Sequence, residues 1–221
     1  MTNLGIRTVA VLGGTGPQGR GLARRFAAAG LPVVLGSRNA ERAQAAAKEL
    51  ASATGGQVEG AANHEAARIG EIVIVAVPWE GHGELLSELA PVLAGKLVVD
   101  CVNPLGFDGK GAFAHRVPEG SAAEQAAALL PESRVVAAFH HVSAALLDDP
   151  TVEFVDGDVL VLGDDRDATE LVQQLAATIP GMRGIYGGRL RNSHQVEAFT
   201  ANLISINRRY RAHAGLRVTD I

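Results

Sequence analysis

Apolar and polar positions follow two different periods along this chain. Short runs dominated by Val, Ile and Leu are typical of buried strands, whereas longer alanine-rich stretches repeat apolar residues every three or four positions, as helices do. Strands are predicted in "TVAVLGG", "PVVLGSR", "QVEGA", "EIVIVAVP", "KLVVDCVNP" and "RVVAAFHH", and "GDVLVLGD" and "GMRGIYGG" follow later. Helices are predicted at residues 17–29, 40–53, 83–93, 122–130, 168–179 and 192–213.

Polar residues mark where several of these helices should begin. Asn39 precedes one helix, and Ser121 with Glu124 forms the Ser-x-x-Glu pattern in which two side chains satisfy free N–H groups. Asn63 is expected to cap a short helix that ends near residue 70. The glycine-rich segment 105–120 is predicted to be a loop.

The alternation of strands and helices predicts an α/β fold of the Rossmann type. We expect a doubly wound parallel sheet with helices on both faces and right-handed crossovers, followed by a small C-terminal helical or αβ extension. Residues 1–142 are expected to form the nucleotide-binding domain. Residues 143–221 are expected to form a smaller domain that closes a cleft, with the final helix as its second wall.

Composition narrows the class of protein. The 221 residues are 47% hydrophobic and carry a net charge of -4, which argues against a general nucleic-acid binder. Cys101 is the only cysteine, so an internal disulfide is excluded and a reducing compartment is expected. The sequence shows no signal peptide and no apolar run long enough to span a membrane, so we expect a cytoplasmic protein with no membrane partner.

The most informative motif is a glycine-rich turn between the first strand and the first helix. Gly14, Gly16 and Gly19 fit G-x-G-x-x-G, in which the glycines permit a tight turn, the approach of a pyrophosphate and close helix–strand packing. A purely structural turn is the alternative. The predicted dinucleotide-binding residues of this turn are Gly14, Thr15, Gly16, Pro17, Gln18 and Gly19.

The end of the second strand indicates which dinucleotide binds. An NAD site would place a carboxylate here to accept from the ribose 2′-hydroxyl, but the sequence has Ser37 and Arg38, with Arg42 one turn later. A hydroxyl and two guanidinium groups suit a 2′-phosphate, because arginine binds phosphate oxygens bidentately. We therefore predict NADP; the alternative is that both arginines form a solvated helix start.

Two further strand ends carry candidate ligand contacts. Val77, Pro78 and Trp79 follow the fourth strand and should turn across the top of the sheet, although Trp79 could equally be a core or dimer-contact ring. His140 and His141 end the sixth strand, and we predict a ligand contact for His140 and a structural role for one of the pair. The other histidines at 64, 82, 115 and 213 are expected at the surface or in loops.

Several catalytic patterns are missing from the sequence. The histidines and the single cysteine have no metal-ligand spacing, and no G-x-S-x-G elbow is present. The turn also fits atypical short-chain dehydrogenases, but Leu190 and Ala214 stand four residues after the two tyrosines, where a catalytic lysine would be needed. Without that lysine, a short-chain dehydrogenase fold would be compatible only with a non-catalytic sensor.

The C-terminal part of the chain reverses the overall charge. Its arginines could form a solvated helix face, a subunit contact or a basic rim for a second anionic ligand. They are Arg183, Arg189, Arg191, Arg208, Arg209, Arg211 and Arg217, against Glu197 and Asp220.

Five motifs in order, "VAVLGGTGPQGRGLA", "VVLGSRNAERA", "AVPWEGH", "VVAAFHHVSA" and "RNSHQVEAFTANLISIN", resemble the F420-dependent NADP reductases. The resemblance covers essentially the whole chain, and its Pro-Trp-Glu turn and Asn-Ser segment are its more specific parts. It implies reversible hydride transfer between NADP and the deazaflavin coenzyme F420, in a homodimer, with both carriers face to face in one cleft.

The same resemblance implies roles for individual residues. Thr15 to Gln18 with Ser37, Arg38 and Arg42 would bind NADP. Val77, Pro78, Val142 and Ala144 would lie along its nicotinamide half, and His140, His194, Ala198 and Thr200 would line the deazaflavin pocket. His140, Val142 and Thr200 would act on the reacting rings by positioning rather than as nucleophiles, since the cofactors carry the chemistry.

Two alternatives remain open from the sequence. One is an NADPH-dependent flavin or ferric reductase, and the other is a non-catalytic NADP-sensing protein. The sequence also departs from the family pattern at His141, Ser143 and His194. Turnover with any acceptor separates the sensor from the enzymes, and preference for deazaflavin over FMN separates the two enzymes.

Overall fold

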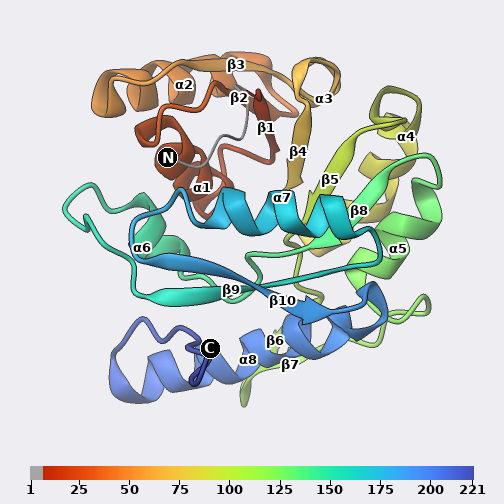
Figure 1. Ribbon diagram of the computed structural model, residues 1–221, viewed down its shortest axis with the longest axis vertical. Helices are drawn as coiled ribbons and strands as arrows, with labels where there is room; N and C mark the ends of the chain where they lie inside the picture. Colours follow the sequence, from red (N-terminus) through yellow and green to blue (C-terminus); the bar gives the residue numbers. More distant parts are fainter. Residues whose placement is uncertain (1–6) are drawn as a thin grey trace.

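A computed structural model describes residues 7–221 of the chain (Figure 1). An eight-stranded sheet runs through the molecule in the order β10-β9-β8-β5-β4-β1-β2-β3, and β6 and β7 form a separate hairpin. The strands are β1 (Val9–Leu12), β2 (Val33–Ser37), β3 (Val58–Ala62), β4 (Ile72–Val75), β5 (Leu97–Asp100), β6 (Leu105–Asp108), β7 (Gly111–Ala114), β8 (Arg134–Ala137), β9 (Gly157–Gly163) and β10 (Met182–Gly188).

The helices cover both faces of this sheet (Figure 1). They are α1 (Pro17–Ala28), α2 (Ala40–Thr54), α3 (Asn63–Ile69), α4 (His82–Leu93), α5 (Ala122–Leu129), α6 (Ala144–Asp148), α7 (Arg166–Ala176) and α8 (Ser193–Tyr210), with 3-10 turns η1 (Trp79–Gly81) and η2 (Leu190–Asn192). None of the helices in the described range is long and apolar enough to cross a bilayer.

The order β3-β2-β1-β4-β5-β8 confirms the predicted Rossmann topology. All neighbours in this part pair in parallel; Val9 of β1, for example, aligns with Val33 of β2 and Ile72 of β4. The carboxyl ends of these strands therefore meet at one edge. The chain continues from β1 to β2 on one side and from β4 to β5 on the other, so the strand order reverses between β1 and β4. Ligands of open α/β sheets bind at such a point.

The expectation of a parallel sheet is wrong for its last two strands. β9 pairs antiparallel with β8, so Val136 aligns with Gly163, and β10 then pairs in parallel with β9. To run parallel to β8, the next strand would have to begin at the amino ends of the strands, so the connection would have to cross the length of the sheet first. The connection from β8 holds only the five-residue α6, and α6 packs on α1 instead of crossing the sheet. The expected boundary between residues 142 and 143 falls in this connection, and strands from both sides share one sheet.

The segment predicted to be a glycine-rich loop contains the β6–β7 hairpin. Asp108 accepts hydrogen bonds from the backbone N–H groups of Lys110 (2.7 Å) and Gly111 (3.1 Å). Gly111 has a φ of +128°, which a glycine adopts without strain. The turn chemistry is thus local, but the strands it joins carry too little apolar alternation to be recognised from sequence.

Two of the three predicted helix caps are confirmed. Asn39 accepts from the Arg42 N–H at 2.8 Å, and Ser121 accepts from the Glu124 N–H at 3.0 Å. The prediction for Asn63 is wrong, because Asn63 is the first residue of α3 and its buried Oδ1 has no hydrogen-bond partner. Ala62 takes the cap position instead.

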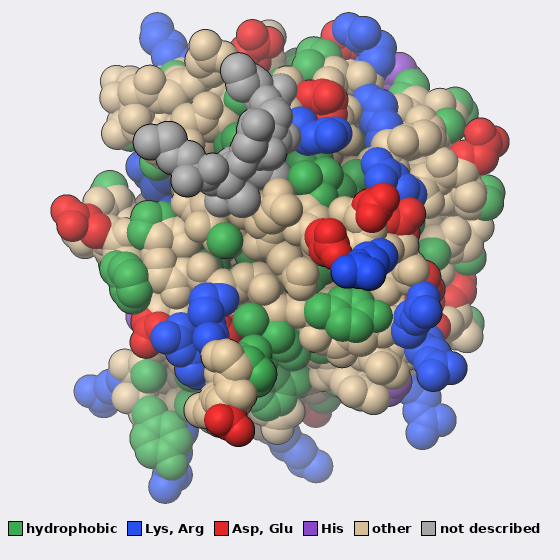
Figure 2. Space-filling view, viewed as in Figure 1, with side chains coloured by type: hydrophobic (Ala, Val, Ile, Leu, Met, Phe, Trp, Pro, Cys, Tyr) green, Lys and Arg blue, Asp and Glu red, His purple; other side chains and the backbone are tan. Residues whose placement is uncertain are grey.

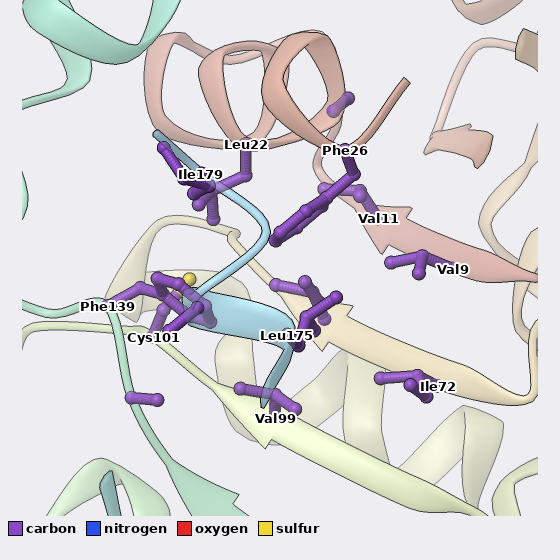
Figure 3. Close-up of a cluster of buried hydrophobic side chains, with 14 of the residues drawn as sticks. Val9, Val11, Leu22, Phe26, Ile72, Val99, Cys101, Phe139, Leu175 and Ile179 are labelled. Carbon is purple, nitrogen blue, oxygen red and sulfur yellow. The ribbon is translucent and has the colours of Figure 1, made fainter. Parts of the chain in front are cut away.

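The core consists of two apolar layers, one on each face of the sheet. Val9 and Val11 of β1 face the layer under α1 and α7, where Phe26 packs (Figure 3). Ala10 and Leu12 face the layer under α3, α4 and α5. This division follows from the two-residue period of a strand, and burial of both faces explains why the strands are continuously apolar.

Candidate functional site

The glycine turn between β1 and α1 leaves backbone exposed where a ligand can approach. Gly13 has a φ of +73°, and a Cβ there would lie 2.5 Å from the Ala76 carbonyl oxygen. A Cβ at Gly19 would lie 2.7 Å from the Gly13 carbonyl oxygen, whereas at Gly16 the only neighbour within 4 Å would be that same oxygen, at 3.3 Å. Gly13, which the motif did not include, therefore makes the tight turn, and Gly16 leaves open space.

The first turn of α1 presents its N–H groups to that open space. Gly16 is the N-cap and has no side chain to cap the helix, and no acidic residue lies in the first turn. Pro17 stands at the first helical position, where its lack of an N–H costs nothing. The free N–H groups and the positive end of the helix dipole suit a phosphate.

The tip of β2 places a hydroxyl beside two free guanidinium groups. Ser37 is buried, and its Oγ accepts from the Asn39 N–H at 3.2 Å. Arg38 and Arg42 are exposed at the start of α2, and within the described part of the chain their side chains form no ion pair. The side chains predicted to distinguish NADP from NAD are thus free to bind a 2′-phosphate.

A cleft of about 400 Å³ opens at the carboxyl ends of the parallel strands. One wall comes from the segments that follow β4, β5 and β8, and the other from α8 and the chain near Ala214. Six predicted site residues line the cleft, namely Gln18, Val77, His140, Val142, Ala144 and Thr200. Asn103, which sequence reasoning did not single out, lines it too.

The other residues predicted to contact NADP or F420 do not line this cleft. Pro78 is exposed, and the Trp79 ring stacks on the His82 ring at a centroid distance of 5.6 Å. His194 is exposed at the start of α8, where its Nδ1 lies 3.3 Å from the Arg191 carbonyl oxygen.

A sharp turn after β8 presents His140 to the cleft. Phe139 has a φ of +65°, which is unusual for a residue other than glycine, and its fully buried ring meets Phe26 edge to face at 6.0 Å. Gln18 donates to the Phe139 carbonyl at 3.1 Å. Asn103 (2.9 Å) and Thr200 (3.1 Å) both donate to the next carbonyl, that of His140. Three cleft residues thereby hold this strained turn in place.

The His140 ring is buried and lacks partners. It is 3% exposed, and neither ring nitrogen forms a hydrogen bond of good geometry with the described residues, although the backbone of Cys101 and Val102 lies close enough to act on its pKa. Burial lowers the pKa of His140 to about 4, and the charge of Asp100 offsets only part of that effect. The ring is therefore neutral at pH 7, with one nitrogen able to donate and the other able to accept. The neighbouring His141 ring bonds instead to the Asp158 carbonyl at 2.8 Å.

Sequence reasoning missed a buried polar cluster behind the cleft. His82, expected at the surface, is fully buried, as is Asp100 at the end of β5, and His82 Nε2 lies 2.6 Å from Asp100 Oδ2. His82 is the first residue of α4, and the inner face of that helix places the ring in the interior. Glu197 on α8 is 2% exposed and accepts from the N–H groups of Ala122 and Ala123.

The arginines of the C-terminal part divide into two groups. Arg183 binds the Asp158 carboxylate at 2.7 Å, and Arg217 binds Asp156 at 2.9 Å, so these two are structural. Arg208 and Arg209 lie in the last turn of α8 and are exposed. Figure 2 shows basic side chains projecting along the lower edge of the molecule, where Figure 1 places α8.

Comparison with known proteins identifies the family. Residues 8–104 match the family described as NADP oxidoreductase coenzyme F420-dependent. The F420-dependent NADP reductase of Methanothermobacter thermautotrophicus is 40% identical over 229 residues, which cover 100% of this chain and 98% of that protein. The chain belongs to the F420-dependent NADP reductase family.

Two further comparisons give a solved structure with a similar fold and a relative that carries a different name. A crystal structure from Arthrobacter sp. FB24, described as an F420-dependent NADP reductase, has a TM-score of 0.82 and 26% identity, and the match covers 98% of this chain and 100% of that one. The rat Metalloreductase STEAP3 is 36% identical over 194 residues, but the match covers 86% of this chain and only 36% of that protein.

Proposed function

We propose that this enzyme transfers a hydride reversibly between NADP(H) and coenzyme F420 in the cleft at the carboxyl ends of the parallel strands. The observation that carries the proposal is the full-length 40% identity to a curated F420-dependent NADP reductase. Two features of the site fit the carriers: the space that a Cβ at Gly16 would occupy, and the unpartnered buried nitrogens of His140. When bound, the two ring systems supply the hydride chemistry.

The glycine turn and the tip of β2 form the NADP end of the site. The turn from Gly14 to Gly19 and the first N–H groups of α1 bind the pyrophosphate. Ser37, Arg38 and Arg42 bind the 2′-phosphate, with Arg38 and Arg42 supplying charge-assisted hydrogen bonds. Val77 and Ala144 lie against the nicotinamide half.

Three cleft residues position the reacting rings. His140 offers a neutral donor and acceptor to the deazaflavin, and Thr200 holds the His140 carbonyl from α8. Val142 is β-branched and therefore stiff, so it presses the two rings together. Good orientation alone can supply roughly 7–11 kcal/mol of a barrier, so no nucleophile is needed.

The residues outside the cleft lining contact the carriers where they extend beyond it. Pro78 and Trp79 flank the nicotinamide side, and His194 and Ala198 flank the deazaflavin side. In this proposal residues 143–221 act as the unit that closes the cleft over residues 1–142, although they share a sheet.

We also propose a cytoplasmic homodimer. Large apolar side chains are exposed on the β6–β7 hairpin and on α8, including Phe107, Phe113, Phe199, Ile206 and Tyr210. Exposed apolar surface of this kind marks interaction sites. Sedimentation velocity of wild type and Phe107→Ser tests this: we expect a dimer that the substitution weakens, and a wild-type monomer would contradict it.

The deciding experiment is steady-state oxidation of NADPH with F420, followed at the deazaflavin absorbance. As controls, NADH replaces NADPH in one assay and FMN replaces F420 in another. We expect fast turnover only with NADPH and F420. Tight NADPH binding without turnover of any acceptor would contradict the proposal and favour an NADP-sensing protein.

His140→Ala tests the assignment of the deazaflavin pocket within the same assay. We expect a higher KM for F420 and an unchanged affinity for NADPH, because the ring makes no side-chain hydrogen bond to the glycine turn or to the tip of β2. A large loss of NADPH binding would remove His140 from the deazaflavin side.

The second candidate function is an NADPH-dependent flavin or ferric reductase. The observation that favours it is the 36% identity to Metalloreductase STEAP3 over 194 residues. Preference for FMN or a ferric chelate over F420, at matched NADPH, would support this candidate.

A further inference from the structure

Four elements bring polar side chains together behind the α8 wall of the cleft. Asp100 ends β5, His82 begins α4, Gln125 lies on α5 and Glu197 lies on α8. His82 and Asp100 are fully buried, and Glu197 is 2% exposed. None of these side chains lines the cleft. Buried ionisable groups are costly unless they are paired, so their arrangement calls for a physical account.

Hydrogen bonding fixes the protonation of His82. Its Nε2 faces the Asp100 carboxylate at 2.6 Å, and its Nδ1 faces Gln125 Oε1 at 2.9 Å. The Gln125 amide nitrogen donates to Glu119, which leaves its oxygen for His82. With the Gln125 amide in this orientation both partners accept, an arrangement that favours the imidazolium, in which both ring nitrogens donate. Accordingly, the pKa of His82 is raised: desolvation is the largest single influence and lowers it, but the Asp100 charge and both hydrogen bonds together outweigh burial.

Asp100 links this pair to the cleft. Its Oδ1 accepts from the Val102 N–H at 3.0 Å, which fixes the turn that follows β5. That turn carries Asn103, whose amide donates to the His140 carbonyl. The imidazolium–carboxylate pair is therefore connected through one turn of backbone to the strained segment that presents the His140 ring.

Glu197 attaches α8, the other wall of the cleft, to the N-terminus of α5. Its carboxylate accepts from the Ala122 N–H (2.9 Å) and the Ala123 N–H (3.2 Å), the first two of α5. Thr200 lies three residues further along α8, on the same face, and donates to the His140 carbonyl. One helix face thus carries both the attachment to α5 and a contact that orients the cleft.

We propose that Glu197 is a positioning residue for the deazaflavin side of the cleft: its carboxylate, held on the N-terminus of α5 beside the His82–Asp100 pair, sets how closely α8 approaches His140. The inference rests on the proposed hydride transfer to F420. The NADP end, formed by the glycine turn and the tip of β2, has no contact with Glu197 and is independent of it.

The charge of Glu197 changes within the physiological range. Burial and the Asp100 charge raise the pKa of Glu197 to about 7, against the opposing effects of the α5 N–H groups and the His82 charge. Among the described residues, Asp100 and His82 are the charged side chains that act on this carboxyl. The ionised form accepts both N–H groups and is attracted to the helix N-terminus. This attraction is smaller than the cost of burying the charge, so ionisation changes how α8 lies against α5 without strengthening the fold.

The first test compares the kinetics of wild type, Glu197→Gln and Glu124→Gln between pH 6 and pH 8. Glu124 is the matched control, because it also caps α5, through Ser121, and glutamine preserves that capping pattern. At pH 8 we expect Glu197→Gln to raise the KM for F420 about 3- to 10-fold, as the loss of one hydrogen bond of ordinary strength would, while the KM for NADPH stays within about twofold. Titration of the coenzyme itself cancels in the ratio between variant and wild type.

The pH profile separates positioning from a general loss of structure. The ratio of F420 KM values between Glu197→Gln and wild type should increase through pH 7, and the ratio for Glu124→Gln should stay constant. Glu197→Asp keeps the charge on a shorter side chain. The KM of this variant for F420 should therefore rise, while the dependence of that KM on pH should survive. Equal increases in both KM values, or the same behaviour in Glu124→Gln, would overturn the proposal.

The second test needs no turnover. Trp79 is the only tryptophan, and its ring stacks on His82, so its fluorescence reports the charge of the cluster. We expect a change in emission with a midpoint near pH 7 in wild type and in Glu124→Gln, and none in Glu197→Gln. A midpoint that persists in Glu197→Gln would overturn the titration of Glu197. Wild type that binds NADPH but does not reduce F420 would instead refute the proposed function and this inference with it, whereas normal turnover with no KM difference refutes the inference alone.

Discussion

Gly16 and Gly19 stand three residues apart in the same turn but are constrained by different neighbours. A Cβ at Gly19 would meet the backbone of Gly13 at 2.7 Å and of Gly14 at 2.9 Å, and backbone cannot move aside cheaply. A Cβ at Gly16 would meet only one carbonyl oxygen, at 3.3 Å. Packing therefore requires the glycine at position 19, whereas at Gly16 the proposed ligand requires it.

We expect Gly19→Ala to lower the free energy of unfolding by about 1–3 kcal/mol through overpacking. Gly16→Ala should leave stability within about 1 kcal/mol but raise the KM for NADPH, because its methyl group occupies the pyrophosphate space. Urea unfolding and steady-state kinetics measure the two effects. Gly81→Ala, where a Cβ meets nothing within 4 Å, is the control. Equal destabilisation by both substitutions would contradict this division of roles.

The two free guanidinium groups at the tip of β2 lead to a second prediction. Replacing both Arg38 and Arg42 with Ala should raise the KM for NADPH at least about 10-fold, since the loss of even one charge-assisted hydrogen bond costs roughly 1.5–3 kcal/mol. NADH use should not change, because NADH has no 2′-phosphate. Arg166→Ala, which removes an exposed arginine paired with Glu170, is the matched control. A parallel loss of NADH activity would show that the arginines do not select the 2′-phosphate.

Among the elements, the short α6 is anchored by one buried side chain from α1. Arg25 is buried and donates to four backbone carbonyls in and after α6, including those of Leu147 (2.9 Å) and Val152 (2.6 Å). Burial lowers the pKa of Arg25, although the guanidinium remains charged. A five-residue helix cannot hold itself together, so this anchor determines where Val142 and Ala144 enter the cleft.

Arg25→Ala should lower the free energy of unfolding by roughly 3 kcal/mol, because it leaves several buried carbonyls without donors. Arg20→Ala removes an ion pair with the Glu49 and Asp148 carboxylates at the surface and should cost about 1 kcal/mol or less. Urea denaturation with both variants gives the comparison. Similar losses for the two would mean that the carbonyls find other donors.

The elements themselves were predicted to different degrees. The strands β1, β2, β4, β5 and β8 follow from continuous apolar runs and β3 from a weaker pattern, and Asn39 and Ser121 cap the helices as their sequence patterns indicate. The β6–β7 hairpin and the direction of β9 were missed. Strand direction depends on the edge of the sheet at which the preceding connection arrives, and no residue pattern within β9 encodes that.

Across the whole molecule, two buried groups make stability depend on pH in opposite directions. The pKa of Glu197 is raised to about 7 by burial, so the native state holds an extra proton between pH 4.5 and 7 and loses stability as pH rises through that window. The pKa of His140 is lowered to about 4 by burial, so the unfolded state holds the extra proton and stability rises with pH between about 4 and 6.5.

These two slopes should nearly cancel in wild type. Glu197→Gln removes the Glu197 slope and leaves the His140 slope unopposed by it, so stability should rise by about 3 kcal/mol from pH 4 to pH 6.5 relative to wild type, at 1.36 kcal/mol per unit. His140→Asn should show the opposite trend. Denaturant unfolding across this range measures both, and identical pH profiles for the two variants would contradict the assignment.

The sequence by itself determined the features that neighbours along the chain decide. The glycine turn, the free arginines after β2 and the capping residues each act within about five positions, so local patterns reveal them. The tertiary structure alone decided which polar side chains meet in the interior. Glu197 binds N–H groups about 75 residues earlier in the chain, and Asp100 pairs with His82 across the sheet edge. Such contacts form because the fold excludes water from both partners, and that condition exists only after distant elements have packed.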